Sequence, residues 1–173
     1  FLIKPNLREL GELAGETLQD DAQIQAAAQR LVDAGRSQAV LVSLAGLRRV
    51  VAIDQGALRA RVQAGIKLEH LIVELERAGF ALANLGSIAK QSLAGAISTG
   101  THGSGIAFRC LADQVQALTL VDATGELRRV ERGHPDFDAI VVGLGCFGVV
   151  CEFEISIVPT FQMHAITDTA SFD

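Results

Sequence analysis

Two stretches of the chain carry apolar residues at the three- and four-residue spacing that is typical of an amphipathic helix. The first runs from residue 20 to residue 34 and is followed by Gly35, and the second begins at Leu68 and is followed by Gly79. Aspartates at the amino end of the first stretch suit a helix dipole, and glycine is a helix stop signal. The sequence therefore predicts two helices, with the apolar positions Ile24, Ala27, Ala28, Leu31 and Val32 in the first and Leu68, Leu71, Ile72 and Leu75 in the second.

Short runs rich in β-branched residues predict strands in the first half of the chain. The runs are residues 40–43, 50–53 and 58–62. Gly46 separates the first two runs, and a turn sequence over residues 54–56 separates the last two. We therefore expect short strands joined by tight turns.

The second half of the chain contains a probable hairpin, a short helix and a half-buried strand. Runs over 115–121 and 126–130 flank a four-residue turn signal at 122–125, which predicts the hairpin. A proline just before residues 137–142 favours a short helix there. Residues 151–158 alternate glutamates with apolar side chains and predict a strand that ends at Pro159.

The order of these elements favours an α+β fold. Strands and helices intermix without the strand-helix-strand rhythm of a parallel sheet. With 173 residues, the chain suits one domain or two small lobes. We expect the lobes to meet near residues 62–66, so that residues 1–63 form the first lobe and residues 64–159 the second.

Composition narrows the class of protein. Hydrophobic residues make up 49% and charged residues 20% of the chain, which favours a compact globular protein. The net charge of −5 leaves no basic surface for a nucleic-acid backbone, so we expect no nucleic-acid partner. The longest nearly apolar run, residues 139–151, is too short to span a bilayer, so no transmembrane segment is expected.

The cysteines point to a reducing compartment. Cys110, Cys146 and Cys151 are an odd number in apolar surroundings and show no metal-ligand spacing. We expect all three to be small buried side chains in a cytoplasmic protein, and we expect no metal site.

One segment, residues 84–105, is built almost entirely from small residues. Its centre, Ser98-Thr99-Gly100-Thr101-His102-Gly103-Ser104-Gly105, interleaves glycines with serines and threonines. Glycine allows the backbone to approach phosphate oxygens closely, and hydroxyl groups add donors without adding charge. A helical turn starting near Ser92 would add amide groups of its own. The segment is therefore a candidate diphosphate cradle, although a glycine-rich turn that only permits tight packing remains an alternative.

Two further features of the sequence have competing interpretations. His102 either donates a hydrogen bond to phosphate or flavin, or braces its loop through the backbone.

Gly143, Gly145 and Gly148 match the glycine spacing of a dinucleotide-binding Rossmann fingerprint. That fingerprint requires a strand before it and a helix after it, whereas this sequence predicts the reverse order, which disfavours nicotinamide binding.

The chain resembles the aldonolactone oxidases, which are flavoproteins of the vanillyl-alcohol oxidase superfamily. The resemblance extends from about Val40 to Pro159, and its longest motif covers residues 91–105. The shorter matching motifs are Ala64-Gly65-Ile66, Asn84-Leu85-Gly86-Ser87-Ile88 and residues 142–148.

This resemblance implies a two-lobed FAD-binding domain of the PCMH type with FAD extended between the lobes. Residues 160–173 would then begin a truncated cap segment, the cap domain itself being absent. By motif, the residues implied to line the flavin and its diphosphate are Ser87, Ser92, Leu93, Ala94, Gly95, Thr99, Gly100, Thr101 and His102, with Val150 meeting the adenine end through its backbone.

The sequence departs from this family at two places. Relatives carry a loop ending in Gly-His-Ser that wraps the diphosphate, but only residues 36–39 separate the first predicted helix from the next strand here, and no histidine lies among them. The chain also stops at Asp173, where relatives continue into the cap that supplies most catalytic residues. No catalytic residue is therefore assigned, and no covalent flavin link is expected.

The resemblance implies the FAD-binding portion of an oxidoreductase that oxidises a sugar lactone or alditol hydroxyl by hydride transfer to flavin. Oxygen or a redox protein would accept the electrons, and a cap domain or partner subunit would complete the active enzyme. One alternative is a noncatalytic module that binds a nucleotide or a subunit. The other is a flavin reductase of the same superfamily.

Overall fold

The computed structural model describes residues 43–164 and residue 166. The helix predicted over residues 20–34 and most of the strand predicted over 40–43 lie outside these residues. The chain divides into two compact units, residues 1–46 and 47–173. All the helices and strands described below belong to the second unit.

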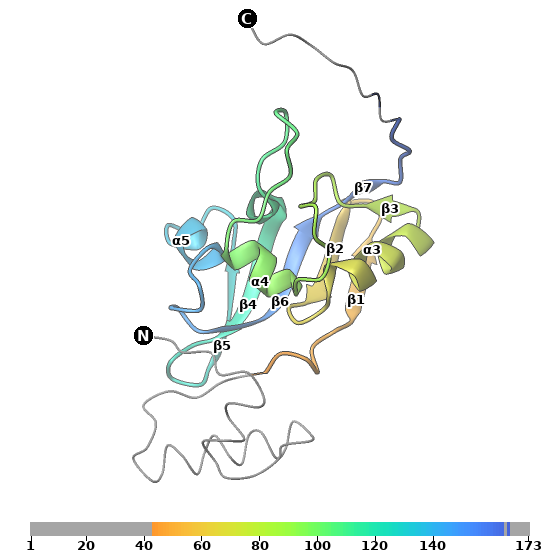
Figure 1. Cartoon of the computed structure of the whole chain (residues 1–173). Helices are drawn as coiled ribbons and strands as arrows, with labels where there is room; N and C mark the ends of the chain where they lie inside the picture. Colours follow the sequence, from red (N-terminus) through yellow and green to blue (C-terminus); the bar gives the residue numbers. More distant parts are fainter. Residues whose placement is uncertain (1–42, 165, 167–173) are drawn as a thin grey trace, which may run out of the picture. The chain divides into compact units, whose positions relative to one another are not determined.

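A five-stranded sheet forms the centre of this unit (Figure 1). All neighbouring strands are antiparallel. The strand order is β1-β2-β6-β4-β5, so that the last long strand in the sequence lies in the middle. The strands are β1 (Val50–Asp54), β2 (Arg59–Gln63), β4 (Val115–Val121), β5 (Leu127–Glu131) and β6 (Val149–Ser156).

Both predicted strand pairs on either side of the central strand are confirmed. The runs at 50–53 and 58–62 form the antiparallel pair β1 and β2 around the predicted turn. The runs at 115–121 and 126–130 form the β4–β5 hairpin, in which Gly125 adopts a φ of 84°. A φ in this left-handed region favours glycine, so the turn sequence correctly located the reversal of the chain.

The strand predicted to end at Pro159 is interrupted earlier. β6 ends at Ser156, where it pairs with Arg59, the first residue of β2. Because β2 goes no further, the following residues change partner: β7 (Val158–Pro159) pairs with the two-residue strand β3 (Phe80–Ala81).

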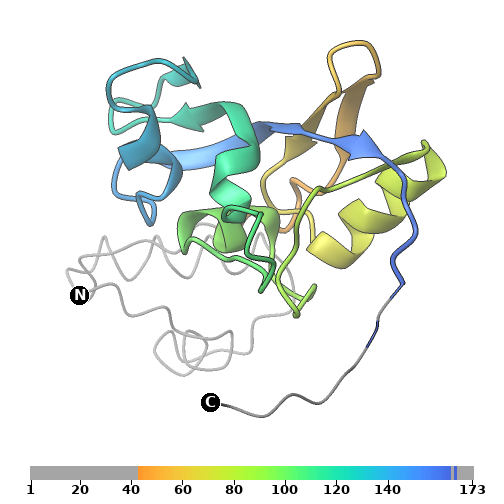
Figure 2. The same ribbon diagram turned by 90° about the horizontal axis from the view of Figure 1, so that it is seen from above.

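Helices cover one face of the sheet (Figures 1 and 2). The helical segments are α3 (Leu68–Arg77), α4 (Leu93–Ser98), the 3-10 turn η1 (Leu111–Gln114) and α5 (Phe137–Val141). α3 confirms the second predicted helix and is followed by Gly79, whose φ is 83°. The core is formed by fully buried side chains that include Leu71, Leu93, Ile97, Leu118 and Phe153.

The opposite face of the sheet is charged, as the alternation along β6 predicts. Glu154, whose side chain is 17% exposed, lies 2.8 Å from Arg59 on β2 and 2.8 Å from Arg129 on β5. Hydrogen bonds from Arg129 and Arg59 hold the pKa of Glu154 below its ordinary value. Arg61 lies 3.8 Å from Glu152. One half-buried carboxylate thus links arginines from two strands that are not adjacent to each other.

An antiparallel sheet with helices on one face is an α+β arrangement, as predicted. The predicted lobe boundary at residue 63 coincides with the end of β2, which pairs with β6, and it stays a prediction. Residues 47–63 therefore group with the chain that follows them, and the compact units separate between Gly46 and Leu47.

Among the described residues, every helix is too short or too polar to cross a membrane. The expectation that all three cysteines are buried is not met, because Cys146 is exposed on a loop and Cys110 and Cys151 are only half-buried.

Candidate functional site

The small-residue segment forms two loops that project side by side from one end of the sheet (Figures 1 and 2). The first loop, residues 82–91, lies between β3 and α4, and the second loop, residues 99–110, joins α4 to η1. A Cβ atom added to Gly103 would lie 2.5 Å from Asn84 Oδ1 and 2.6 Å from the Leu85 carbonyl oxygen. At Gly86 an added Cβ would lie 2.8 Å from Thr101 Cγ2. These two glycines therefore serve close packing between the loops.

The helix between the loops has one buried face and one open face. Leu93, Ala96 and Ile97 are fully buried in the core. Gly95 and Thr99, four residues apart and thus on one face of the helix, are exposed, as is His102. The segment from 92 to 103 is therefore accessible to a ligand along its outer side.

The amide groups at the start of α4 bond to the protein itself. Ser92 is the N-cap, and its Oγ accepts a hydrogen bond from the Gly95 amide at 3.2 Å. The Leu93 and Ala94 amides donate to the carbonyl oxygens of Ile66 and Ala64, at 2.8 and 2.9 Å. We expected these amides to face an anion, but in this arrangement the carbonyl oxygens of Ile66 and Ala64 accept their hydrogen bonds instead.

Free amides occur instead after the helix. Within the described part of the chain, the backbone N–H groups of His102, Gly103 and Ser104 donate to no protein acceptor. These amides of the second loop are therefore available as hydrogen-bond donors to a ligand.

Gly100 ends α4 in a way that requires glycine. Its φ is 64°, its amide donates to the Ile97 carbonyl at 3.0 Å, and the Thr101 amide donates to the Ala96 carbonyl at 2.9 Å. This pair of bonds is a Schellman motif with glycine at the left-handed position. A Cβ added there would meet no atom within 4 Å, so the space beside this backbone is open.

His102 braces its own loop. Nδ1 lies 2.9 Å from the Gly103 carbonyl oxygen, which can only accept a hydrogen bond, so Nδ1 carries the proton. In the neutral ring Nε2 is then an acceptor. This geometry favours the bracing role, because donation from Nε2 to a phosphate would require the protonated ring.

The site residues predicted from the sequence lie on segments that contact one another, and we call this set of residues the small-residue strip. At one end, Ala64 donates to the Cys151 carbonyl, one residue after Val150, and accepts from Ala94 in α4. At the other end, the Gly86 and Thr101 contact brings the first loop, which carries Ser87, beside the second. The strip comprises Ser87, Ser92, Leu93, Ala94, Gly95, Thr99, Gly100, Thr101, His102 and Val150.

Two amide side chains at the base of the loops were not assigned a role from sequence. Asn84 Nδ2 donates to the Arg109 carbonyl, and Gln114 Nε2 donates to the Asn84 carbonyl, both at 3.0 Å. The only sequence signal for them is that large polar side chains are rare in a segment of small residues.

The glycines of the Rossmann-like motif have packing roles. α5 precedes them and the antiparallel strand β6 follows, which is the reverse of the fingerprint's order. An added Cβ at Gly148 would collide with the Val121 carbonyl, and one at Gly143 would lie 2.7 Å from the Ala139 carbonyl. Gly145 has a φ of 83°. The nicotinamide interpretation of this motif is therefore excluded.

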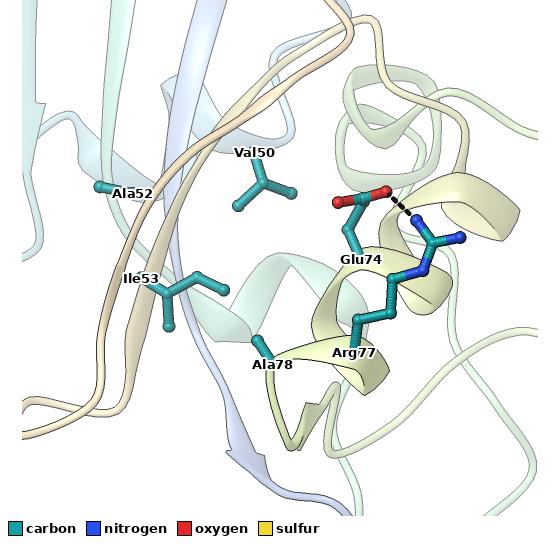
Figure 3. A pocket seen from close by; sticks show the side chains of 6 residues that line it. All are labelled: Val50, Ala52, Ile53, Glu74, Arg77 and Ala78. Carbon is teal, nitrogen blue, oxygen red and sulfur yellow. Dashed lines mark hydrogen bonds and ion pairs between the residues drawn. The ribbon is translucent and has the colours of Figure 1, made fainter.

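A separate hollow of about 410 Å³ lies between β1 and α3 (Figure 3). Val50 and Ile53 project from the strand toward the helix, and an ion pair between Glu74 and Arg77 lies on the helix side. The hollow shares no residue with the small-residue strip. Among the described residues, no three His, Cys, Asp or Glu side chains are grouped to hold a metal ion.

Comparison with known sequences identifies relatives of one chemical class. The FAD binding domain family matches residues 22–131. A putative D-arabinono-1,4-lactone oxidase of Neurospora crassa is 42% identical over 71% of this chain and 22% of its own length. An L-gulono-1,4-lactone dehydrogenase of Mycobacterium tuberculosis is 31% identical over 94% of this chain and 39% of its own length. The chain thus spans between about a fifth and two fifths of these relatives.

Comparison with solved structures agrees on the fold. An alkyldihydroxyacetonephosphate synthase superposes with a TM-score of 0.59 at 21% identity, over 68% of this chain and 22% of that protein. A cholesterol oxidase variant from Brevibacterium sterolicum superposes with a TM-score of 0.60 at 21% identity, over 65% of this chain and 24% of that protein.

Proposed function

The chain belongs to the FAD binding domain family, and we propose that its small-residue strip holds FAD for an oxidoreductase that oxidises a hydroxyl-bearing carbon of a sugar lactone or alditol. The observation that carries this proposal is the open outer face of the strip, which continues from α4 into the second loop. A dinucleotide is an extended ligand, and the strip offers it a continuous surface of backbone and small side chains.

The residues present fit the chemistry of a diphosphate. The strip contains no aspartate or glutamate that would repel it. The amides at 102–104, which have no acceptor among the described residues, and the hydroxyl of Ser87 supply donors, and the open space beside Gly100 permits close approach of phosphate oxygens to the backbone. Because the α4 amides are occupied, we propose that this helix contributes shape and the second loop contributes most hydrogen bonds.

When bound, FAD supplies the redox chemistry by accepting hydride from the substrate carbon. The residues of this chain bind and orient it. His102 fixes the backbone direction of residues 102–104 through its bond to Gly103, and thereby aims their amides. The buried side chains of α4 hold the strip against the sheet.

The substrate, the electron acceptor and the location belong to the same proposal. The sequence relatives are named as oxidases or dehydrogenases of arabinono- and gulono-lactones, which supports a sugar lactone as substrate. We propose that groups contacting the sugar lie in the portion of the relatives that this chain does not span, with residues 160–173 leading toward it. Oxygen or a redox protein would accept the electrons in a cytoplasmic setting.

A titration with FAD tests this proposal directly. The purified chain should quench the fluorescence of added FAD with a saturable, stoichiometric endpoint, and acid precipitation should release all flavin into the supernatant. Failure to bind FAD would contradict the proposal and favour the noncatalytic module. In the longer protein, flavin reduction by a sugar lactone but not by a reduced nicotinamide would separate an oxidase from a reductase.

A further inference from the structure

The two loops are joined by a short chain of amide hydrogen bonds that begins at the sheet. Gln114 is the last residue of η1 and immediately precedes β4, so its backbone is anchored to the central sheet. Its Nε2 donates to the carbonyl oxygen of Asn84 in the first loop at 3.0 Å. Asn84 in turn donates from Nδ2 to the carbonyl oxygen of Arg109 in the second loop at 3.0 Å.

Asn84 uses its backbone carbonyl and both ends of its side-chain amide in hydrogen bonds where the loops meet. Besides the two bonds above, its Oδ1 accepts the Leu85 amide at 3.0 Å and lies directly over the backbone of Gly103. Asn84 thus helps to set the distance between the first and second loops, together with the packing of Gly86 on Thr101 and a 3.4 Å hydrogen bond from Gln91 Nε2 to Thr101 Oγ1. Gln114 ties this asparagine to the sheet.

Gln114 leaves one of its own groups unsatisfied. Its Oε1 is buried and has no hydrogen-bond partner among the described residues. The assignment of oxygen and nitrogen is fixed, because only the nitrogen can donate to the Asn84 carbonyl. A buried hydrogen-bond acceptor without a partner lowers the stability of the folded chain. A methionine, which has a similar length and no such oxygen, would fill the same space without this cost. Stability alone therefore does not explain a glutamine at this position.

We propose that Gln114 and Asn84 form a clamp that holds the first and second loops at the separation that FAD binding requires, with Gln114 as its positioning residue. This inference rests on the proposed FAD binding. The clamp holds the first loop, with Ser87, against the second loop, with the free amides of residues 102–104. The donors then stand in place before the ligand arrives, which lowers the ordering cost of binding.

Substitution Q114M in the 173-residue chain tests the clamp. It removes the bond to Asn84 together with the unsatisfied oxygen, so we expect the Tm of the FAD-free chain to change by less than about 3 °C. The Kd for FAD should rise about tenfold, because the loops are no longer held at one separation. N84A removes the bond to Arg109 from the other side, and the two substitutions together should weaken FAD binding by less than the product of their separate effects.

The matched control is Q116M. Gln116 lies two residues further along, on β4. Its Nε2 donates to Ser156 Oγ on β6 at 2.8 Å and to the backbone carbonyl of Gln114 at the long distance of 3.5 Å, and neither bond involves the two loops or the Gln114 side chain. Its substitution should leave the Kd for FAD unchanged. Equal Kd values for wild type and Q114M would overturn the proposal, and so would a loss of affinity that only parallels a loss of Tm.

Hydrogen exchange of the Leu85 amide in the FAD-free chain provides a second readout. This amide donates to Asn84 Oδ1, so Q114M should accelerate its exchange while Q116M should not. If wild-type chain does not bind FAD, the proposed function fails, and the exchange rate alone then decides the clamp. Unchanged Leu85 exchange in Q114M would refute it.

Discussion

Replacement of Gly100 by alanine separates a structural from a binding role of the small-residue strip. Gly100 has a φ of 64° and open space around the position of an added Cβ. An L-residue in this left-handed conformation costs about 1–2 kcal/mol. The same added methyl group would occupy the open space through which we propose that a phosphate approaches the backbone.

Gly79 provides the matched control. It follows α3 as Gly100 follows α4, its φ is 83°, and a Cβ added there also meets nothing within 4 Å. Both alanine variants should therefore lose about 1–2 kcal/mol of stability, which corresponds to a fall in Tm of roughly 2–8 °C for a chain of this size. Only the Gly100 variant should also weaken FAD binding. The Gly100 amide itself donates to Ile97, so the expected loss is one hydrogen bond between a displaced phosphate and the proposed donors at residues 102–104. Such a bond to a charged oxygen is worth about 1.5–3 kcal/mol, so the Kd should rise on the order of 10- to 100-fold.

The assay combines thermal unfolding of the FAD-free chains with fluorescence titration of FAD. Titration below both unfolding transitions ensures that the measured Kd refers to folded protein. If G100A and G79A weaken FAD binding equally, backbone strain alone explains the effect, and the idea that the ligand approaches Gly100 is wrong. An unchanged Kd for G100A would have the same consequence.

Three further predictions concern the fold and its thiols. E154Q should destabilise the chain by about 1–2 kcal/mol at neutral pH in urea titrations. Because the folded pKa of Glu154 is lowered from 4.5, this loss of stability should be complete above pH 4.5 and should vanish as the pH falls through the lowered pKa of the folded state. A constant difference in stability across that pH range would contradict the ion-pair explanation. G148A should destabilise the chain by more than about 2 kcal/mol, because its methyl group meets the backbone of β4. G145A should cost about 1–2 kcal/mol, from the positive φ of this position alone. Equal losses of stability in chemical denaturation would disprove the packing role of Gly148. Cys146, which is exposed, should react with iodoacetamide faster than Cys151, because burial raises the pKa of the Cys151 thiol. Peptide mass spectrometry that finds the opposite order would contradict this prediction and show that the start of β6 opens.

Much of the local structure follows from sequence pattern. Leu68, Leu71 and Leu75 repeat at helical spacing, and all three are fully buried on one face of α3. The alternation along β6 places Phe153 and Ile155 in the core and Glu154 on the charged face. These predictions succeed because the helical and strand periods convert a one-dimensional pattern directly into one buried face.

Sequence pattern does not show contacts between residues that lie far apart in the chain. It does not reveal that β2 pairs with β6, which begins 86 residues after β2 ends, and the lobe boundary at residue 63 stays a prediction. The first amides of α4 were expected to be free because nothing in residues 92–95 shows that Ile66 and Ala64 accept their hydrogen bonds. In both cases the missing information is a nonlocal backbone contact.

The small-residue segment illustrates the same division. Glycine, serine and threonine at residues 98–105 were sufficient to predict a backbone-lined surface, because the absence of large side chains is itself a property of the sequence, whereas the binding of phosphate there stays a prediction. Which glycine packs against another loop, as Gly103 does, and which leaves space for a ligand, as Gly100 does, was decided only by the tertiary structure. The physical reason is that steric exclusion acts between segments that the chain brings together in folding, and residue order alone does not record those distances.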